Sequence, residues 1–299
     1  MFALKKLRKS RRLSPKQLAK VLDIEVKEFN KWEENPNLIP QKKLSQLAYS
    51  FDLDSDELKI WLADDSSPIN TSKHYIGLNK DIEDGFWGNL GIKLIGQSKS
   101  LWFPITLATV KYLDNALINT QSNEDWITLD TLNNRSLAIK PALVSRIYLL
   151  DEYQSPIEDD WEILLDNYTG KSGEFYKALE DIDSDSMCFH GEIELCDSVK
   201  LDVEKFINQH DLGFDQVWEM VEYTHVYTLD GEMFSQLINR NLSNIYSDIE
   251  CEWLPTMLEL SSDEIDLYIP SAKVCLIDMP KRKLRAEMKL LHKEFEGES

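Results

Sequence analysis

The sequence contains one group of residues whose types could bind a transition metal. Cys188, His190, Glu192 and Cys196 lie within nine consecutive positions, and thiolate, imidazole and carboxylate groups are the usual ligands of zinc in proteins. Their spacing fits no standard zinc module, because none of the four cysteines forms a C-x-x-C pair. We therefore expect ordinary packed or exposed side chains here, and the sequence predicts neither a metal site nor a cofactor.

Signatures of common enzymes are also missing. The sequence has no H-E-x-x-H zinc-protease motif, no G-x-x-x-x-G-K-[ST] phosphate loop, no G-x-S-x-G nucleophile turn and no G-x-G-x-x-G dinucleotide motif. The acidic runs at 158–160 and 181–185 lack the glycine and the terminal glutamate of a calcium loop. No residue pattern supports an enzyme, and we expect that the protein is not one.

Charge is distributed unevenly along the chain. The net charge of −20 would repel a polyanion. Residues 1–62, however, hold thirteen Lys or Arg against nine Asp or Glu, whereas the other residues hold twenty against forty-four. Residues 1–20 include eight Lys or Arg and no acidic residue. A basic segment joined to an acidic body is typical of a protein that binds nucleic acid with one end.

Length and composition indicate a soluble, multidomain protein. A chain of 299 residues suits two or three domains. It contains no apolar run that approaches the roughly 18 residues of a membrane span, and its first residues do not fit a signal peptide. Four cysteines without a disulfide pattern are typical of reduced thiols. We therefore expect a cytoplasmic location and no membrane partner.

Apolar residues recur at helical spacing through the first 62 residues and predict five short helices. Ser14 and Gln17 fit a capping box around Pro15, so one helix should begin at residue 15. It should end near Leu22, because Asp23 tolerates the left-handed backbone that a sharp turn requires. The next helix should then span about residues 26–33.

These helices carry a recurring sequence pattern. Residues 13–24 read L-S-P-K-Q-L-A-K-V-L-D-I, residues 29–33 read F-N-K-W-E, and L-x-x-L-A follows at 44–48. In this the chain resembles the lambda-repressor-like, or XRE, helix-turn-helix family. The resemblance covers about a fifth of the chain. It implies an all-α, five-helix, lambda-repressor-like DNA-binding domain over residues 1–64.

The resemblance also implies how the domain would contact DNA. The helix over residues 26–33 would lie in the major groove, with Val26, Lys27, Asn30 and Lys31 at base edges. A lysine could donate to guanine, the asparagine could pair with adenine, and the valine could touch a thymine methyl group. The residues that would contact phosphates are Arg11, Lys16, Gln17, Lys42 and Lys43.

Three positions depart from the family pattern. Pro15 stands where many members place a glutamine that contacts DNA, and Asp23 replaces the turn glycine. Glu25 replaces the Ser or Thr that opens the recognition helix, and Glu28 follows it. Carboxylates that face phosphates weaken binding to DNA. The alternative function is therefore a protein-interaction or antitoxin-like module that uses the same fold as a docking surface.

The acidic remainder is predicted to be α+β and rich in strands, after a polar linker at 65–74. One α+β unit is expected at 75–155, and a second, ending in a helix, at 156–299. Strand-like runs lie at 92–95, 101–105, 126–129, 136–139 and 146–150. Helices are expected near 109–118, 174–183 and 200–209.

Two sets of similar segments favour a duplication in this remainder. In the first set, 131–134 leading to 145–148 resembles 228–231 leading to 243–246. In a fainter set, 137–148 resembles 258–277. Chance similarity of hairpin patterns is the alternative. If the duplication is real, the remainder holds two related small α+β units.

The last predicted helix, near 281–291, has Leu284, Met288 and Leu291 on one side. This pattern favours packing or dimerisation over a second contact with nucleic acid. We expect a transcriptional regulator that binds double-stranded DNA as a homodimer. The acidic body would dimerise or sense an effector, whose nature the sequence does not reveal.

Overall fold

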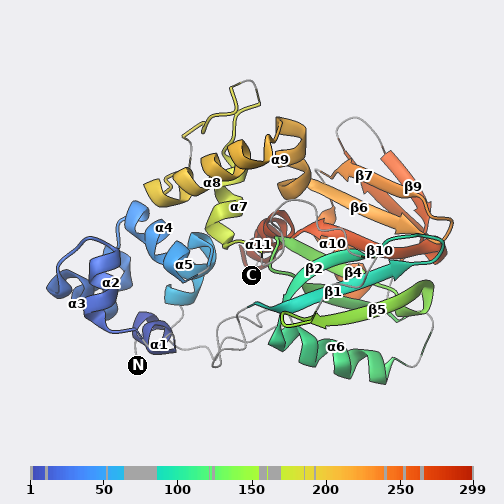
Figure 1. Ribbon diagram of the computed structural model, residues 1–299, viewed down its shortest axis with the longest axis horizontal. Helices are drawn as coiled ribbons and strands as arrows, with labels where there is room; N and C mark the ends of the chain where they lie inside the picture. The colour runs from blue at the N-terminus through green and yellow to red at the C-terminus, as the bar shows by residue number, and fades with distance from the viewer. Residues whose placement is uncertain are drawn as a thin grey trace. The chain divides into compact units, whose positions relative to one another are not determined.

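The computed structural model describes most of the chain (Figure 1). The described residues are 3–10, 13–51, 53–63, 86–120, 122, 125–154, 160, 170–184, 186–191, 193–238, 241–251, 254–262 and 266–297, with backbone alone at 10, 60, 61 and 291–297. The chain divides into two compact units. Met1–Asp84 with Lys171–Val217 form what we call the helical unit, and Gly85–Gly170 with Trp218–Ser299 form the sheet unit.

The helical unit is built from both of its chain segments. Its elements are α1 (Ala3–Ser10), α2 (Pro15–Val21), α3 (Val26–Glu34), the 3-10 turn η1 (Pro36–Leu38), α4 (Gln41–Ser50), α5 (Ser55–Ala63), α7 (Gly173–Glu180) and α8 (Asp197–His210). A further helix, α9 (Phe214–Val221), crosses the boundary between the units. An apolar core joins α1 to α5, and its large buried side chains include Leu4, Leu18, Leu22, Phe29, Trp32, Leu47, Phe51 and Leu58.

The connection between α2 and α3 forms as the sequence predicts. The Ser14 hydroxyl accepts the Gln17 N–H at 3.2 Å, and Gln17 Oε1 accepts the Ser14 N–H at 2.8 Å, which completes the capping box. Asp23 has a φ of 50°, in the left-handed region. The turn that follows lets the Ile24 N–H donate to the Ala19 carbonyl at 3.0 Å. Helix α3 begins at Val26, as expected.

The prediction of an all-α five-helix domain over residues 1–64 is wrong. Helices α1 to α5 are not a unit by themselves, because α7 and α8 belong to the same compact unit and α7 packs on α4. The fully buried carboxylate of Glu174 on α7 accepts the Ser55 N–H and the Ser45 hydroxyl, each at 2.6 Å. A Cβ atom on Gly173 would stand 2.7 Å from Asp54 Cβ. The start of α5 is therefore shaped to receive α7.

The sheet unit is a mixed α/β region. Its first segment contains β1 (Phe86–Leu94), β2 (Leu101–Thr106), α6 (Leu107–Asn119), β3 (Ile127–Asp130), β4 (Arg135–Ile139), the 3-10 turn η2 (Pro141–Leu143) and β5 (Val144–Asp151). Its second segment contains β6 (Tyr223–Thr228), β7 (Met233–Leu237), α10 (Leu242–Glu250), β8 (Met257–Ser261), β9 (Asp266–Pro270), the 3-10 turn η3 (Ser271–Lys273), β10 (Val274–Pro280) and α11 (Lys281–Gly297). Each of the five predicted strand runs overlaps one of β1 to β5, although the run at 92–95 covers only the end of β1, and the predicted helix near 109–118 lies within α6.

The described strands form three sheets. The orders are β2-β1-β5, β3-β4-β10-β6-β7 and β8-β9, and all neighbouring strands in these orders are antiparallel. Figure 1 shows β4 and β10 side by side in the middle of the sheet unit. The larger sheet therefore joins strands from both segments of the unit.

The same order of elements occurs twice in the sheet unit. In β1–β5, which we call the first half, two strands are followed by a helix, two more strands, a 3-10 turn and a last strand. The same order occurs in β6–β10, which we call the second half. The first and last strands of each half pair, and both pairs shift register at one residue. That residue is Ser145 in the first half and Cys275 in the second. The two halves are therefore equivalent down to the position of a bulge.

This repeat matches only one of the two predicted sets. The fainter set places 137–148 opposite 258–277, which the structure also does, since β4-η2-β5 corresponds to β9-η3-β10. The other set is wrong, because 145–148 lies in β5 whereas 243–246 lies in α10. The compact units also follow other boundaries than the predicted 75–155 and 156–299, since the two halves share one unit.

Each half has its own apolar core, and the β4·β10 pair contributes to both. Ala138 of β4 lies in the core of the second half, and Cys275 and Leu276 of β10 lie in the core of the first. Helix α11 buries Leu284 against the second core, with Met288 packed beside it. The predicted packing of the terminal helix is confirmed for these two residues, and the side chain of Leu291 lies outside the described residues.

A buried histidine in this sheet makes stability depend on pH. Burial, and after it the Arg135 charge, lower the pKa of His225 to about 4, and its Nδ1 lies 2.8 Å from the Ser235 hydroxyl. Between about pH 6.5 and 4 the unfolded chain binds a proton that the folded chain does not. The free energy of unfolding should therefore fall by about 3 kcal/mol as pH drops through this window.

Urea unfolding curves at pH 7, 5.5 and 4.5 measure this dependence. His225→Gln should flatten the fall, whereas His190→Gln, at an exposed histidine, should keep it. Equal slopes for the wild type and His225→Gln would show that another group causes the pH dependence.

Candidate nucleic-acid interface

Helix α3 is fixed to the helical unit by one face. Phe29 and Trp32 are buried in the core. Arg8 Nε of α1 donates to Glu33 Oε1 at 2.7 Å, and these two side chains are only 7% and 9% exposed. A buried, hydrogen-bonded ion pair fixes orientation, because its groups lose much of their attraction if they move apart. The opposite face of α3 is therefore held in a defined position toward solvent.

That opposite face carries the four residues predicted to contact base edges. Val26 is 39% exposed, and Lys27, Asn30 and Lys31 are exposed as well. Within the described part of the chain these polar side chains make no hydrogen bond or ion pair. Two ammonium donors, one amide and one apolar contact can together recognise base edges in a major groove. The structure thus brings the predicted base-contacting set together.

The predicted phosphate contacts divide into two groups. Lys16 and Gln17 are exposed near the start of α2. Gln17 Oε1 is engaged in the capping box at 2.8 Å, which leaves its amide nitrogen able to donate. Arg11 lies outside the described residues. Lys16 and Gln17 could therefore hold a phosphate without loss of any contact that the structure shows.

Lys42 and Lys43 of α4 are already engaged within the chain. Lys42 Nζ lies 3.0 Å from Asp197 Oδ1 on α8. Lys43 Nζ donates to the Leu22 carbonyl at the end of α2 and to Gln46 Oε1 at 3.3 Å. A cation at this place satisfies a free carbonyl and suits the negative end of the helix dipole. Lys43 thus stabilises the α2 terminus, and Lys42 faces a carboxylate.

Asp197 is the residue that the sequence analysis missed. It is separated from Lys42 by 155 positions, and no local pattern marks it as a neighbour of α4. Its side chain is 84% exposed, so it places a negative charge on the surface beside a lysine predicted to bind DNA. This arrangement would weaken attraction of a phosphate to Lys42.

If the chain binds DNA through this surface, replacing Asp197 with Asn should strengthen that binding. The change removes the carboxylate and frees Lys42, so one more phosphate contact becomes available, and affinity at low salt should rise several-fold. The slope of log K against log salt should steepen by about 0.9. Fluorescence anisotropy titrations at three salt concentrations measure both effects. Glu204→Gln, at an exposed position of the same helix, is the control, and equal behaviour of both variants would contradict a phosphate contact at Lys42.

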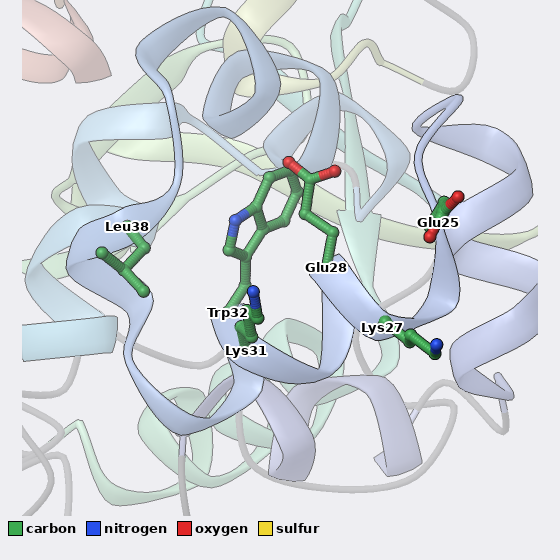
Figure 2. Close-up of a pocket in the computed structure, with 6 residues that line it drawn as sticks. All are labelled: Glu25, Lys27, Glu28, Lys31, Trp32 and Leu38. Atoms are coloured by element: carbon green, nitrogen blue, oxygen red, sulfur yellow. The ribbon is translucent and has the colours of Figure 1, made fainter.

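A shallow depression of about 490 Å³ lies along α3. Its lining residues are Glu25, Lys27, Glu28, Lys31, Trp32 and Leu38. Figure 2 shows them extending from the residue before α3 to the η1 turn. Trp32 is only 3% exposed and Leu38 is 55% exposed. The same depression thus offers exposed apolar surface at Leu38 and two carboxylates beside its lysines.

Of the residues that suggested a metal site, Cys188, His190 and Cys196 are described, and they are not assembled into one. Cys188 is exposed, whereas Cys196 is buried and its N–H donates to the Ser45 hydroxyl at 3.1 Å. His190 Nδ1 lies 3.5 Å from Asp183, and Glu192 lies outside the described residues. In the part of the chain that the structure describes, no three His, Cys, Asp or Glu side chains come together as metal ligands.

Comparison with known proteins adds no assignment. The chain matches no protein-family model, no curated protein and no solved structure. The resemblance to the lambda-repressor-like family therefore stays a prediction from the residues of α2 and α3. Over the described residues, none of the helices has both the length and the apolar character that crossing a membrane requires.

Proposed function

We propose that this protein is a transcriptional regulator that acts in the cytoplasm and binds double-stranded DNA through α2 and α3. One observation carries the proposal. Val26, Lys27, Asn30 and Lys31 lie exposed on one face of α3, while the other face is fixed by the core and by the Arg8–Glu33 pair. A rigid helix that presents unengaged donors suits the major groove, since base recognition requires a defined orientation.

Each residue has a distinct role in this proposal. Lys27 and Lys31 donate to guanine O6 and N7, Asn30 pairs with an adenine edge, and Val26 contacts a thymine methyl group. Phosphates are held by Lys16 and by the amide of Gln17, so that α2 sets the position of α3. In this arrangement Lys43 acts indirectly, because it stabilises the end of α2 through the Leu22 carbonyl.

A homodimer fits this function better than a monomer. One helix of nine residues makes few base contacts, and two linked helices bind a two-fold operator with a raised effective concentration. The acidic remainder of the chain repels DNA and would favour approach by the basic end. No cofactor is needed for this recognition.

Selection of bound duplexes from a random library tests the proposal. The full-length protein should enrich one motif. Lys27→Ala and Asn30→Ala should each weaken binding to that motif by about 5- to 100-fold and relax the preference at one base pair. Lys16→Ala should weaken binding to all sequences alike. Lys59→Ala, at an exposed lysine of α5, is the matched control. Failure to enrich any motif with folded protein would overturn the proposal.

A second candidate function is docking of a partner protein on α3. The depression lined by Trp32 and Leu38 favours it, as do Glu25 and Glu28, whose charges oppose phosphates. Leu38→Ser separates the two functions, because it removes exposed apolar surface without adding a charge, and Leu38 lies in the η1 turn, outside the proposed base-contacting set. The variant should bind DNA like the wild type under the first proposal and should lose a protein partner under the second.

A further inference from the structure

The two halves of the sheet unit are joined by one strand pair. Strand β4 of the first half pairs with β10 of the second, antiparallel, with Ile139 opposite Leu276 and Ala138 opposite Ile277. Every residue of both strands is buried. The pair completes both cores, since Ala138 packs in the second core and Leu276 in the first. The joint therefore stabilises both halves together.

The repeat assigns an equivalent to each strand of this joint. By the shared bulge at Ser145 and Cys275, β5 is the equivalent of β10, and by element order β9 is the equivalent of β4. These two equivalents do not pair with each other. Among the described strands β5 pairs with β1 and β9 pairs with β8, so each has one edge without a described partner. Figure 1 shows β5 and β9 apart, on opposite sides of β4 and β10.

The paired strands β4 and β10 also differ from their equivalents β9 and β5 in solvent exposure. No residue of β5 is buried, whereas every residue of its equivalent β10 is. In β9 only Ile269 is buried, whereas all of β4 is. The β5 edge includes Ile147, Tyr148, Leu149 and Leu150, and Tyr268 of β9 is 54% exposed. Apolar strand edges of this kind are templates for pairing with another chain.

We propose that β5 of one copy pairs with β9 of a second copy, in the register of the β4·β10 pair. Transfer of that register places Arg146 opposite Ile269, Ile147 opposite Tyr268 and Tyr148 opposite Leu267. Two such joints, each between β5 of one copy and β9 of the other, would close a two-fold dimer. The occupant of each edge is thus a second copy of this chain.

Packing supports this register. Ile269 and Leu267 already contact the second core, as their equivalents Ile139 and Leu137 contact the first. Ile147 packs against the first core, as its equivalent Ile277 lies in the second. Tyr268 would cover Ile147 from the partner, in the place where Ala138 covers Ile277. Three differences separate the proposed joint from the β4·β10 pair. Pro270 replaces Lys140 and has no N–H to donate, Arg146 replaces Leu276, and the larger Tyr268 replaces Ala138.

Sedimentation velocity of the full-length protein, without DNA, tests the pairing independently of DNA binding. The wild type should sediment as a dimer at micromolar concentration, and Tyr268→Lys should shift it to monomer by more than tenfold in Kd. Tyr153→Lys is the matched control, because Tyr153 is 86% exposed and lies outside both strands. A monomeric wild type, or a dimer that Tyr268→Lys leaves unchanged, would overturn the proposal.

Cysteine crosslinking tests the register. Cys188 and Cys251, which are exposed, are first replaced by Ser. In that background Ile147→Cys with Tyr268→Cys should form a disulfide between copies under mild oxidation, because directly opposite residues lie within bonding distance. Tyr148→Cys with Tyr268→Cys is shifted by one residue and should not. Crosslinking of the shifted pair alone would contradict the proposed register.

Discussion

Asp278→Ala is expected to lower the free energy of unfolding of the sheet unit by about 3–5 kcal/mol. Asp278 on β10 accepts Arg135 Nε of β4 at 2.6 Å, and the two side chains are 7% and 5% exposed. Without the carboxylate, a buried guanidinium loses its counter-charge, which is among the most destabilising changes in a protein interior.

The contacts of Arg135 explain why Asp278→Ala should destabilise both halves of the sheet unit. Its guanidinium also donates to the Tyr223 carbonyl at 2.8 Å and to the Asp278 carbonyl at 2.9 Å. The side chain thus connects β4, β10 and the start of β6, which belong to different halves. Loss of the pair should weaken the joint between the halves, and so both cores.

Urea unfolding followed by far-UV circular dichroism measures the Asp278→Ala effect. Lys273→Ala is the control, because it breaks a 2.9 Å ion pair with Asp230 in which both side chains are about half exposed. Surface pairs of this kind contribute little to stability. Similar midpoints for the two variants would show that the buried pair does not hold the two halves together.

Glu174→Ala should destabilise the helical unit by about 2–5 kcal/mol. The carboxylate is fully buried, and it satisfies the Ser55 N–H at the start of α5 and the Ser45 hydroxyl of α4. Truncation leaves two buried donors without an acceptor and also creates a cavity. The hydrogen bond from Lys177 to the Ser55 hydroxyl, at 3.0 Å, lies at the same helix start and would be weakened as well.

Hydrogen exchange locates the Glu174→Ala effect more sharply than a global unfolding curve. Amides of α4, α5 and α7 should lose protection together, because the carboxylate joins all three helices. Glu204→Ala, at an exposed position of α8, should leave protection unchanged. If only α7 lost protection, α4 and α5 would be stable without it, and the helical unit would not be one cooperative body.

Local elements of this chain are predictable from sequence because their causes lie within a few residues. Ser14 and Gln17 form the capping box, and Asp23 takes the left-handed turn, each through contacts with immediate neighbours. The strand runs that became β1 to β5 follow from apolar periodicity. The four predicted base-contacting residues share a face of α3 because the helical repeat places them there.

The arrangement of elements is not predictable in this way because its causes are distant in sequence. Glu174 reaches Ser55 across 119 positions, and Lys42 reaches Asp197 across 155. A short helix with a buried glutamate gives no local sign of its partner. The predicted fold class is therefore wrong about which helices form one compact unit, although the five helices α1 to α5 are themselves predicted. The sequence shows part of the repeat, the correspondence of 137–148 with 258–277. The equivalence of the whole halves depends on the pairing of β1 with β5 and of β6 with β10, which no local pattern contains.

Electrophoretic mobility shift of the full-length protein tests DNA binding through α3 most directly. The DNA is the region upstream of its own gene, at two salt concentrations, and the comparison is the Lys27→Ala, Asn30→Ala double variant. We expect a sequence-specific shift that weakens steeply with salt and is lost in the double variant. A folded protein that gives no shift, or a shift unchanged in the double variant, would contradict DNA recognition by α3 and favour docking of a protein partner there.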